Sequence, residues 1–439
     1  MKKKYRIILY TSIFLLCVVA SIILVVKKSN SVYEEESKPK VVKHKSMLSM
    51  NLEQTAGSGD YKTVTQSSWP TEGYKFNAEL SKCENGSTLS WDDTKKAVIM
   101  QGNVSDKCYV YFDIWIPSIA DYCTSGTDLA TCVKNFGDQG PSVSNIYIHN
   151  SSLTNGAGDN SYRYAGANPN NFVCFGSDAS PCPIDNLYRI IGVFGENYHG
   201  ANGKQLVKLI KYDYMTTDEL GTDGDYSQTY KEWGMDSTYK GTYGDGERIG
   251  VYYWNYKATG SATNTWSTSL LNKTNLNTNF INNIGTTWAN KIATVTWKVG
   301  GNTWANIGTK TSSVAYTNEI TNPVTTNTTD NATTYSAKIG LMYVSDYGFA
   351  ASPEAWTLTM SSYNNTTATN NNWMYMGLYE WTISRSADYS NSAFRVYGVG
   401  DVSDGGVGSR DGVRASFNLE SSVSYVSGSG SMSDPIVIN

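Results

Sequence analysis

The chain has 439 residues, of which 40% are hydrophobic and 17% are charged, and its formal net charge is −4. This is enough apolar material for one large core and a smaller one. The weak acidity, without a basic cluster in the part expected to fold, argues against nucleic acid as a partner, because phosphate binding requires concentrated Lys and Arg.

An uncharged hydrophobic run at residues 7–26 follows a short basic segment. At 1.5 Å per residue it spans about 30 Å, the thickness of the hydrocarbon layer of a membrane. We expect residues 1–6 to be a cytoplasmic tail and residues 7–26 an uncleaved transmembrane helix. The protein would then be a single-pass cell-membrane protein with extracellular C-terminal domains. The alternative is a cleaved signal peptide, for which residues 18–20 form only a poor cleavage site.

Six cysteines beyond this run fall into three local pairs: Cys83 with Cys108, Cys123 with Cys132, and Cys174 with Cys182. Proximity favours this pairing among the connectivities that six cysteines allow. Zinc is the weaker alternative, because C-x-x-C does not occur and His44, His149 and His199 are not near two cysteines at ligand spacing. Paired cysteines behind an export segment indicate an oxidising exterior.

Four further segments are predicted along the chain. Residues 27–50 are polar and rich in lysine, which indicates a solvated tether. Residues 51–116 contain short alternating runs separated by turns, which predict a small all-β domain stapled by the first cysteine pair. Residues 117–144 predict a helical spacer that holds the second pair. Residues 145–439 are expected to form one domain.

Within this last segment, several elements are predicted from the pattern of apolar residues. Residues 187–194 and 205–210 predict an early hairpin. Residues 265–292 predict two helices with Asn, Ser and Thr at the caps. Residues 338–345 predict a further strand, and the Asn- and Thr-rich residues 309–334 predict a long surface loop.

A recognisable order of motifs lies near the end of the chain. W-M-Y-M-G-L-Y-E-W-T-I-S-R at 373–385 is followed by S-A-F-R-V-Y at 392–397, G-D-V at 400–402 and D-G-V-R-A-S-F at 411–417. This order resembles the C-terminal half of C-type-lectin-like domains of the formylglycine-generating-enzyme type, as in surface proteins of gut Firmicutes. Ala415 stands where that family usually has proline.

The resemblance implies a fold class for the whole chain. We expect an α+β protein whose C-type-lectin-like (sulfatase-modifying-factor-like) domain is preceded by a transmembrane helix and the small all-β, disulfide-stapled domain. Enzymes with this fold oxidise a cysteine by means of two active-site cysteines and copper. This chain has no cysteine from Pro183 onward, so we do not expect that activity. We expect the protein not to be an enzyme and to have no cofactor.

The calcium–sugar motifs of animal C-type lectins, E-P-N or Q-P-D followed by W-N-D, do not occur. Four aspartates could supply oxygens to another calcium site, although turn and capping roles are favoured: Asp346, Asp401, Asp404 and Asp411. A hydrolase with an unrecognised site stays open as an alternative. Glu354 and Glu380 are its candidate carboxylates, but their spacing does not imply a catalytic pair.

The strand expected around residues 394–402 has a readable alternation. Phe394 and Val396 should face the core, and Arg395 and Tyr397 should point the other way. In the similar variable proteins of diversity-generating retroelements, the corresponding strands and turns expose the side chains that contact the ligand. The resemblance therefore implies a set of ligand-binding candidates: Tyr379, Trp381, Tyr389, Asn391, Arg395, Tyr397, Asp401 and Arg410.

Tyr and Arg are also frequent in binding hot spots. We therefore expect an adhesin-like cell-surface protein that binds an extracellular protein or a glycan. The alternative is a structural cell-envelope component without a specific ligand.

Overall fold

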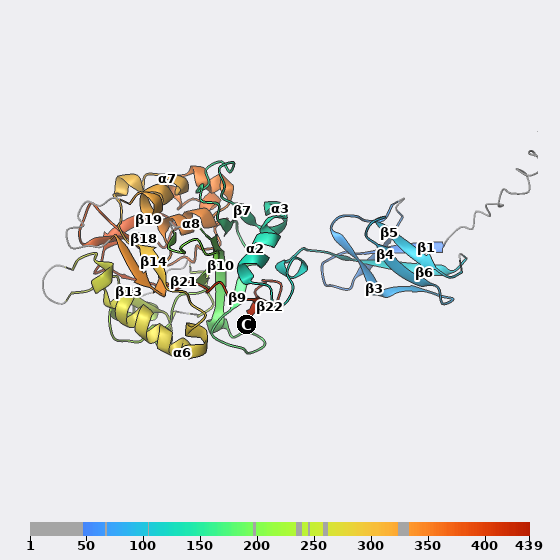
Figure 1. Ribbon diagram of the computed structural model, residues 1–439, viewed down its shortest axis with the longest axis horizontal. Coiled ribbons are helices and arrows are strands. Elements are labelled where there is room, and N and C mark those ends of the chain that lie inside the picture. Colours follow the sequence, from blue (N-terminus) through green and yellow to red (C-terminus); the bar gives the residue numbers. More distant parts are fainter. Residues whose placement is uncertain are drawn as a thin grey trace, which may run out of the picture. The chain divides into compact units, whose positions relative to one another are not determined.

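The computed structural model describes residues 47–65, 68–103, 105–195, 199–233, 239–244, 246–257, 262–323 and 333–439. The chain divides into two compact units, one that ends at Ile116 and one that comprises Pro117–Asn439 (Figure 1). The predicted cytoplasmic tail, the predicted transmembrane segment and most of the predicted tether lie outside the described residues.

The smaller unit consists of strands: β1 (Met47–Glu53), β2 (Tyr61–Val64), β3 (Tyr74–Cys83), β4 (Thr88–Asp92), β5 (Ala97–Gln101) and β6 (Lys107–Ile114). One sheet has the order β2-β1-β6-β3, in which β1 and β6 are parallel and the other pairs are antiparallel. β4 and β5 form a separate hairpin. The short strands predicted for residues 51–116 are confirmed.

The core of the smaller unit is built around Phe112, which is 1% exposed. Its ring centre lies 5.9 Å from that of Trp69, 5.9 Å from that of Phe76 and 5.6 Å from that of Trp91. The first predicted disulfide joins β3 to β6 at directly opposed residues. A core this small gains appreciably from such a link, which is worth about 2–4 kcal/mol.

The largest sheet of the larger unit contains β7 (Ile146–Ile148), β8 (Tyr162–Tyr164), β9 (Phe172–Cys174), β10 (Leu187–Phe194), β11 (Leu206–Lys211), β16 (Ile339–Gly340) and β21 (Ser416–Asn418). Its order is β16-β21-β11-β10-β8-β7, and β9 also pairs with β10. The predicted hairpin is confirmed as β10 and β11, whose residues are all buried. Strands that are buried on both faces have nearly continuous apolar sequences, and for this reason the hairpin could be predicted from the sequence.

The remaining strands form separate sheets of two or three strands. These are β12 (Tyr226–Thr229), β13 (Gly250–Tyr253) and β20 (Arg410–Asp411); β14 (Val295–Lys298) and β15 (Thr334–Ala337); β17 (Glu380–Arg385), β18 (Ser392–Val396) and β19 (Val402–Gly406); and β22 (Tyr425–Ser427) and β23 (Val437–Ile438).

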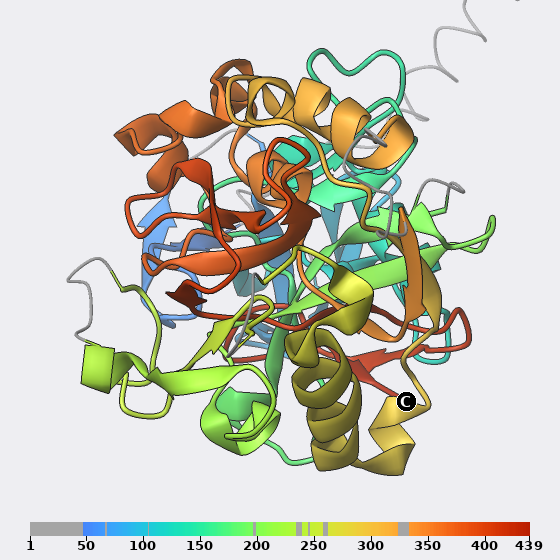
Figure 2. The same ribbon diagram turned by 90° about the vertical axis from the view of Figure 1, so that its left-hand side faces the viewer.

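The helices of the larger unit are α2 (Leu129–Gly137), α3 (Pro141–Ser144), α4 (Thr217–Leu220), α5 (Tyr230–Trp233), η5 (Leu271–Phe280), α6 (Ile281–Ala289), α7 (Ser312–Tyr316), η7 (Thr317–Thr321), α8 (Val344–Ala350) and α9 (Thr366–Thr369). Single 3₁₀ turns are η1 (Ile119–Asp121), η2 (Ile184–Asn186), η4 (Trp266–Thr268), η6 (Trp304–Asn306), η8 (Pro353–Thr357) and η9 (Met360–Ser362). α6 and α7 lie at opposite edges of the unit, with strands between them (Figure 2).

Two helical segments show how local residues shape this unit. α2, inside the predicted spacer, begins at a side-chain cap, where Asp128 accepts from the Thr131 amide at 2.8 Å. Its apolar face, with Val133 and Phe136, packs in the main core, so residues 117–144 belong to the larger unit. The strand predicted at 338–345 is shorter in the structure and is limited to β16. It cannot continue, because α8 begins at Val344, where the Asp346 carboxylate accepts a hydrogen bond from the Tyr343 amide and caps the helix.

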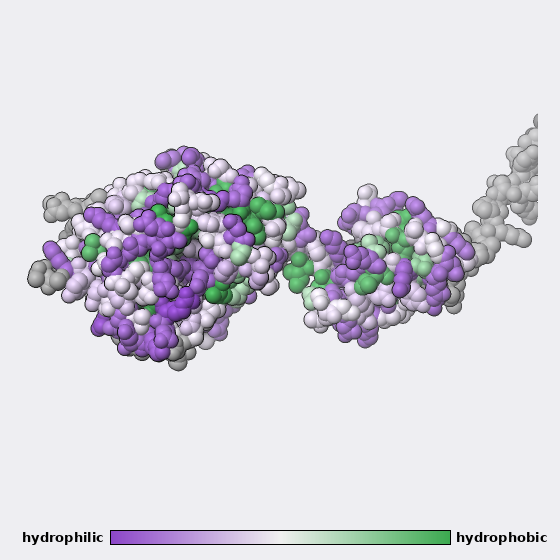
Figure 3. Space-filling model, turned by 90° about the horizontal axis from the view of Figure 1, so that it is seen from below, coloured by the Kyte–Doolittle hydropathy of each residue, from purple (hydrophilic) through white to green (hydrophobic). Residues whose placement is uncertain are grey.

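The predicted fold class is wrong. Instead of an α+β chain with one lectin-like domain, the structure is β-rich, with 32% strand and 22% helix, and its strands are spread over many small sheets. Most of the described strands are only two to six residues long, and every described sheet except the largest has two to four strands. Figure 3 shows a face of the larger unit on which apolar atoms form separate patches among hydrophilic ones.

The predicted single-pass membrane localisation is likewise not supported. In the described part of the chain, no helix is long and apolar enough to cross a membrane. A span needs about 20 apolar residues. The longest helical stretch joins the 10 residues of η5, which contain several Asn and Thr, to the 9 residues of α6, and Gly285 interrupts it with a non-helical backbone.

Candidate functional site

The strand β18 carries the centre of the predicted binding face. Phe394 and Val396 are 0% and 3% exposed and pack in the hydrophobic core. Arg395 and Tyr397 lie on the other face and are half-buried. The predicted alternation is confirmed, because successive residues of a strand point to opposite faces.

Arg395 gathers three more of the predicted residues around its guanidinium group. The guanidinium carbon lies 4.7 Å from the ring centre of Tyr397 and 5.2 Å from that of Tyr379. The ring of Trp381, which is fully buried, lies at 5.7 Å. Nη2 donates to the Tyr397 hydroxyl at 3.2 Å, and Nη1 donates to both carboxylate oxygens of Asp411 at 3.1 Å. We call these five residues the Arg395 cluster.

Asp411 supplies a counterion that the sequence did not assign to Arg395. Its side chain is fully buried, and this burial raises the pKa of its carboxyl to about 6, although the Arg395 guanidinium opposes the shift. The Arg395 side chain is itself only 15% exposed. A ligand carboxylate arriving here would compete with Asp411 for a cation that is already paired.

The structure does not bring all the predicted residues into the Arg395 cluster. Tyr389 is 60% exposed and Asn391 is also exposed, and no described contact joins either of them to Arg395. Arg410 is exposed on β20. Asp401 is half-buried, and burial raises the pKa of its carboxyl. The predicted face is therefore one cluster with separate exposed neighbours.

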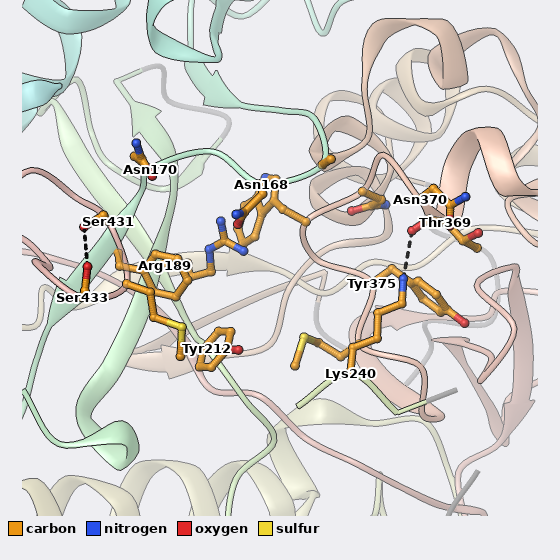
Figure 4. Close-up of a pocket in the computed structure, with 16 residues that line it drawn as sticks. Asn168, Asn170, Arg189, Tyr212, Lys240, Thr369, Asn370, Tyr375, Ser431 and Ser433 are labelled. Carbon is orange, nitrogen blue, oxygen red and sulfur yellow. Dashed lines mark hydrogen bonds between the residues drawn. The ribbon is translucent and has the colours of Figure 1, made fainter. Parts of the chain in front are cut away.

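A hollow of about 640 Å³ lies in another part of the larger unit, and sequence reasoning missed it (Figure 4). Its walls come from residues 167–172, Arg189 of β10, Tyr212, Lys240, residues 369–376 and residues 431–433. None of the lining residues is Asp or Glu. We call this cavity the Arg189 hollow.

Arg189 lies at the floor of the hollow and is 4% exposed. Its guanidinium carbon lies 4.3 Å from the ring centre of Phe172 and 4.7 Å from that of Trp373. Nε donates to Asn171 Oδ1 at 2.6 Å, and Nη2 donates to the Pro169 carbonyl at 2.8 Å. Burial lowers the pKa of Arg189 to about 9, so the group stays charged at neutral pH.

Lys240 provides a second cation at the rim. It is exposed, its Nζ lies 4.4 Å from the ring centre of Tyr375, and it donates to the Thr369 carbonyl at 3.3 Å. Partial burial lowers the pKa of its amine. No carboxylate pairs with either Arg189 or Lys240 among the described residues.

The aromatic floor is held in place by hydrogen bonds to the backbone. Trp373 Nε1 donates to the Tyr164 carbonyl at 2.9 Å, and the Tyr375 hydroxyl donates to the Gly398 carbonyl at 2.7 Å. Both aromatic residues are nearly buried. Such fixed side chains reduce the ordering cost of binding.

One wall of the hollow depends on a close backbone approach at Gly430. The residue has φ +82°, and a Cβ there would lie 2.6 Å from the Asn170 carbonyl oxygen. The Gly430 carbonyl in turn accepts from the Phe172 amide at 2.8 Å. Only glycine combines this conformation with this contact.

The sequence held one signal for the hollow. Arg189 is a charged residue inside the otherwise apolar strand β10, all of whose residues are buried. A buried arginine requires partners, so its position pointed to a polar site next to the sheet. Two of the other walls, residues 369–376 and 431–433, lie more than a hundred residues further along the chain, which spacing alone does not reveal.

A metal site is not supported by the described residues. Side chains able to hold an ion come together at Cys83, Asp106 and Cys108. The two cysteines form a disulfide, and Asp106 accepts from the backbone amides of Asn85 and Ser87. A disulfide sulfur is not the thiolate that binds metals.

The carboxylates considered for calcium or hydrolysis are engaged or isolated. Glu380 is buried and accepts from Arg414 Nε at 2.8 Å. Asp346 is buried and paired with Lys208. Glu354 is exposed. Neither glutamate faces the other in a described pocket, so the pair that hydrolysis requires is not assembled in the described part of the chain.

Two arginine-centred sites thus distinguish the larger unit. The Arg395 cluster pairs its cation with Asp411, whereas the Arg189 hollow lacks an acid. The function of the protein is therefore inferred from the geometry of these two sites. Comparisons of the chain with models of protein families, with curated proteins and with solved structures find no match.

Proposed function

We propose that the protein is a binding protein and that its ligand, a glycan or a segment of another protein, enters the Arg189 hollow. The observation that carries this proposal is a buried arginine without a carboxylate partner at the floor of an open, aromatic-lined cavity. A cation kept in such a place is costly for the folded state unless a partner meets it. Ligand sites typically combine an apolar lining with a few convergent polar groups.

The Arg395 cluster is the weaker candidate for this role. Its cation is already paired with the buried carboxylate of Asp411 and hydrogen-bonded to Tyr397. We therefore assign the cluster to the stability of the β17-β18-β19 sheet. The exposed Tyr389 remains free to contribute to a contact outside the cluster.

The test is a blocking substitution at the mouth of the hollow. Asn370 lines the hollow and is exposed, so Asn370→Trp should fill the entrance without disturbing the core. Asn364→Trp is the matched control, because Asn364 is exposed nearby and does not line the hollow. Binding would be measured for the full chain on a glycan array and by pull-down of protein partners.

We expect Asn370→Trp to abolish binding of whichever ligand the wild-type protein captures, and Asn364→Trp to leave it unchanged. Equal binding by all three proteins would place the ligand elsewhere and refute the assignment to the hollow.

A further inference from the structure

The Arg189 hollow differs in charge from the rest of the chain. The whole chain has a formal net charge of −4, yet the 16 residues that line the hollow include two cations and no acid. A locally positive cavity in an acidic protein attracts anions. The hollow should therefore favour a ligand that carries negative charge.

Arg189 is held in a geometry that leaves one donor nitrogen for a ligand. Phe172 and Trp373 pack against the guanidinium, while Nε and Nη2 are used by Asn171 and a backbone carbonyl. Nη1 has no partner among the described residues and is not sealed from solvent. A carboxylate oxygen that reaches Nη1 forms a charge-assisted hydrogen bond at a site already rigid.

Lys240 can make a second contact, either with the same carboxylate of the ligand or with another oxygen of the ligand close to it. Figure 4 shows Arg189 and Lys240 on different sides of the cavity, with Lys240 next to Thr369. The amine is exposed and mobile around its stem, so it can turn from the Thr369 carbonyl to an arriving anion.

The neutral polar groups of the hollow match a ligand rich in hydroxyl groups. Side-chain amides and hydroxyls line it: Asn168, Asn170, Asn370, Ser431 and Ser433. Each amide offers both a donor and an acceptor, which is what a hydroxyl requires. Tyr212 is half-buried and adds a ring against which the apolar face of a sugar can pack.

We propose that the hollow binds an acidic sugar at the end of a glycan, with its carboxylate on Arg189 and Lys240 and its hydroxyls on the surrounding amides. This inference rests on the proposed function, because it names the ligand class of the same cavity. The shared chemistry is a sugar that bears a carboxylate, whether a uronic acid or a sialic acid.

The experiment compares acidic sugars with their neutral esters and with a sugar that carries a different anion. The full chain is titrated with glycans ending in glucuronic acid or in N-acetylneuraminic acid, with their neutral methyl esters, and with a sulfated sugar of similar size. The proteins compared are the wild type, Lys240→Gln, Lys240→Arg and Lys273→Gln. Lys273 is exposed on η5 and does not line the hollow, so its variant is the matched control.

We expect at least one carboxylated glycan to bind, and its methyl ester to bind at least tenfold more weakly. Loss of one charge-assisted contact in Lys240→Gln should raise the Kd roughly tenfold. Lys240→Arg should restore affinity, and Lys273→Gln should match the wild type. The relative affinity for the two acidic glycans shows whether the hollow prefers a uronic acid or a sialic acid.

Three outcomes would overturn the inference. They are equal affinity for acids and esters, binding of the sulfated sugar alone, or unchanged affinity in Lys240→Gln. If Asn370→Trp still blocks a neutral glycan or a protein ligand in these cases, the proposed function survives without the acidic sugar. If Asn370→Trp blocks nothing, both fail.

Discussion

The Arg395 cluster and the Arg189 hollow both pack a guanidinium group against aromatic rings, but only the cluster contains a carboxylate. Arg395 donates to the buried Asp411, whereas Arg189 donates to an amide oxygen and a backbone carbonyl. The two sites therefore differ in their carboxylate and not in their aromatic rings. Where a carboxylate neutralises the arginine, the ion pair stabilises the fold, and where none does, the arginine can bind an anionic ligand.

The largest expected effect concerns the acid of the cluster. Asp411→Ala leaves Arg395 largely buried without its counterion, and breaking such a pair from one side costs about 3–5 kcal/mol. Because Arg395 keeps 15% exposure, we expect about 3 kcal/mol, measured by denaturant unfolding. Asp178→Ala, at an exposed position, is the control and should stay within about 0.5 kcal/mol of the wild type. A loss no larger than the control's would show that the pair does not hold the sheet.

The pH dependence of stability gives the next largest effect. Burial raises the folded-state pKa of Asp411 from 3.8 to about 6, so the folded state binds more protons than the unfolded state between these values. The free energy of unfolding should therefore fall as pH rises from about 4 to about 6, by about 2–3 kcal/mol from this group. Unfolding of the wild type and of Asp411→Asn across this range would isolate it. Parallel curves for the two proteins would contradict the shift.

Binding in the hollow should respond to pH in a different range. The hollow has no carboxylate, and the pKa of Arg189 is lowered only to about 9, so affinity for an acidic sugar should be level from pH 6 to 8. It should then weaken as the pH rises further, because burial lowers the pKa of both cations of the hollow, Arg189 and Lys240. Titrations with the fold monitored by circular dichroism would measure this. A fall in affinity centred near pH 6 would point to Asp411 and hence to the cluster.

The smallest effect is expected at the edge of the cluster. Tyr397→Phe removes the hydroxyl that accepts from Arg395 Nη2 but keeps the ring against the guanidinium. A half-exposed hydrogen bond of this kind is worth about 1 kcal/mol of unfolding free energy. Tyr389→Phe is the matched control, since the exposed Tyr389 hydroxyl has no described partner. If the control lost as much stability, the effect would not belong to the cluster.

Local relations were predictable from the sequence, and distant ones were not. The burial of Phe394 beside the half-open Arg395 follows from the strand period, and the three disulfides join cysteines at most 25 residues apart. Asp411 reaches Arg395 from a different sheet, which the alternation of one strand does not encode.

The fold class and the hollow required tertiary information. Motif order near the end of the chain predicted one lectin-like domain, but it did not show how short strands would divide into many small sheets. The hollow joins Arg189 to Lys240, Trp373 and Ser431, so no local pattern contains it. Arg189 itself was visible as a charge within an apolar strand, and its meaning depended on partners remote in sequence.

The backbone approach at Gly430 means that the outline of the hollow is set partly by a position that contributes no atom to its lining. A mutational scan confined to the lining residues would pass over it. A side chain at Gly430 would push against the segment that carries Asn170 and Phe172, and would reshape the cavity although no lining residue had been replaced. In related proteins, a substitution at the position of Gly430 would change which ligands fit the hollow even if all the lining residues were identical.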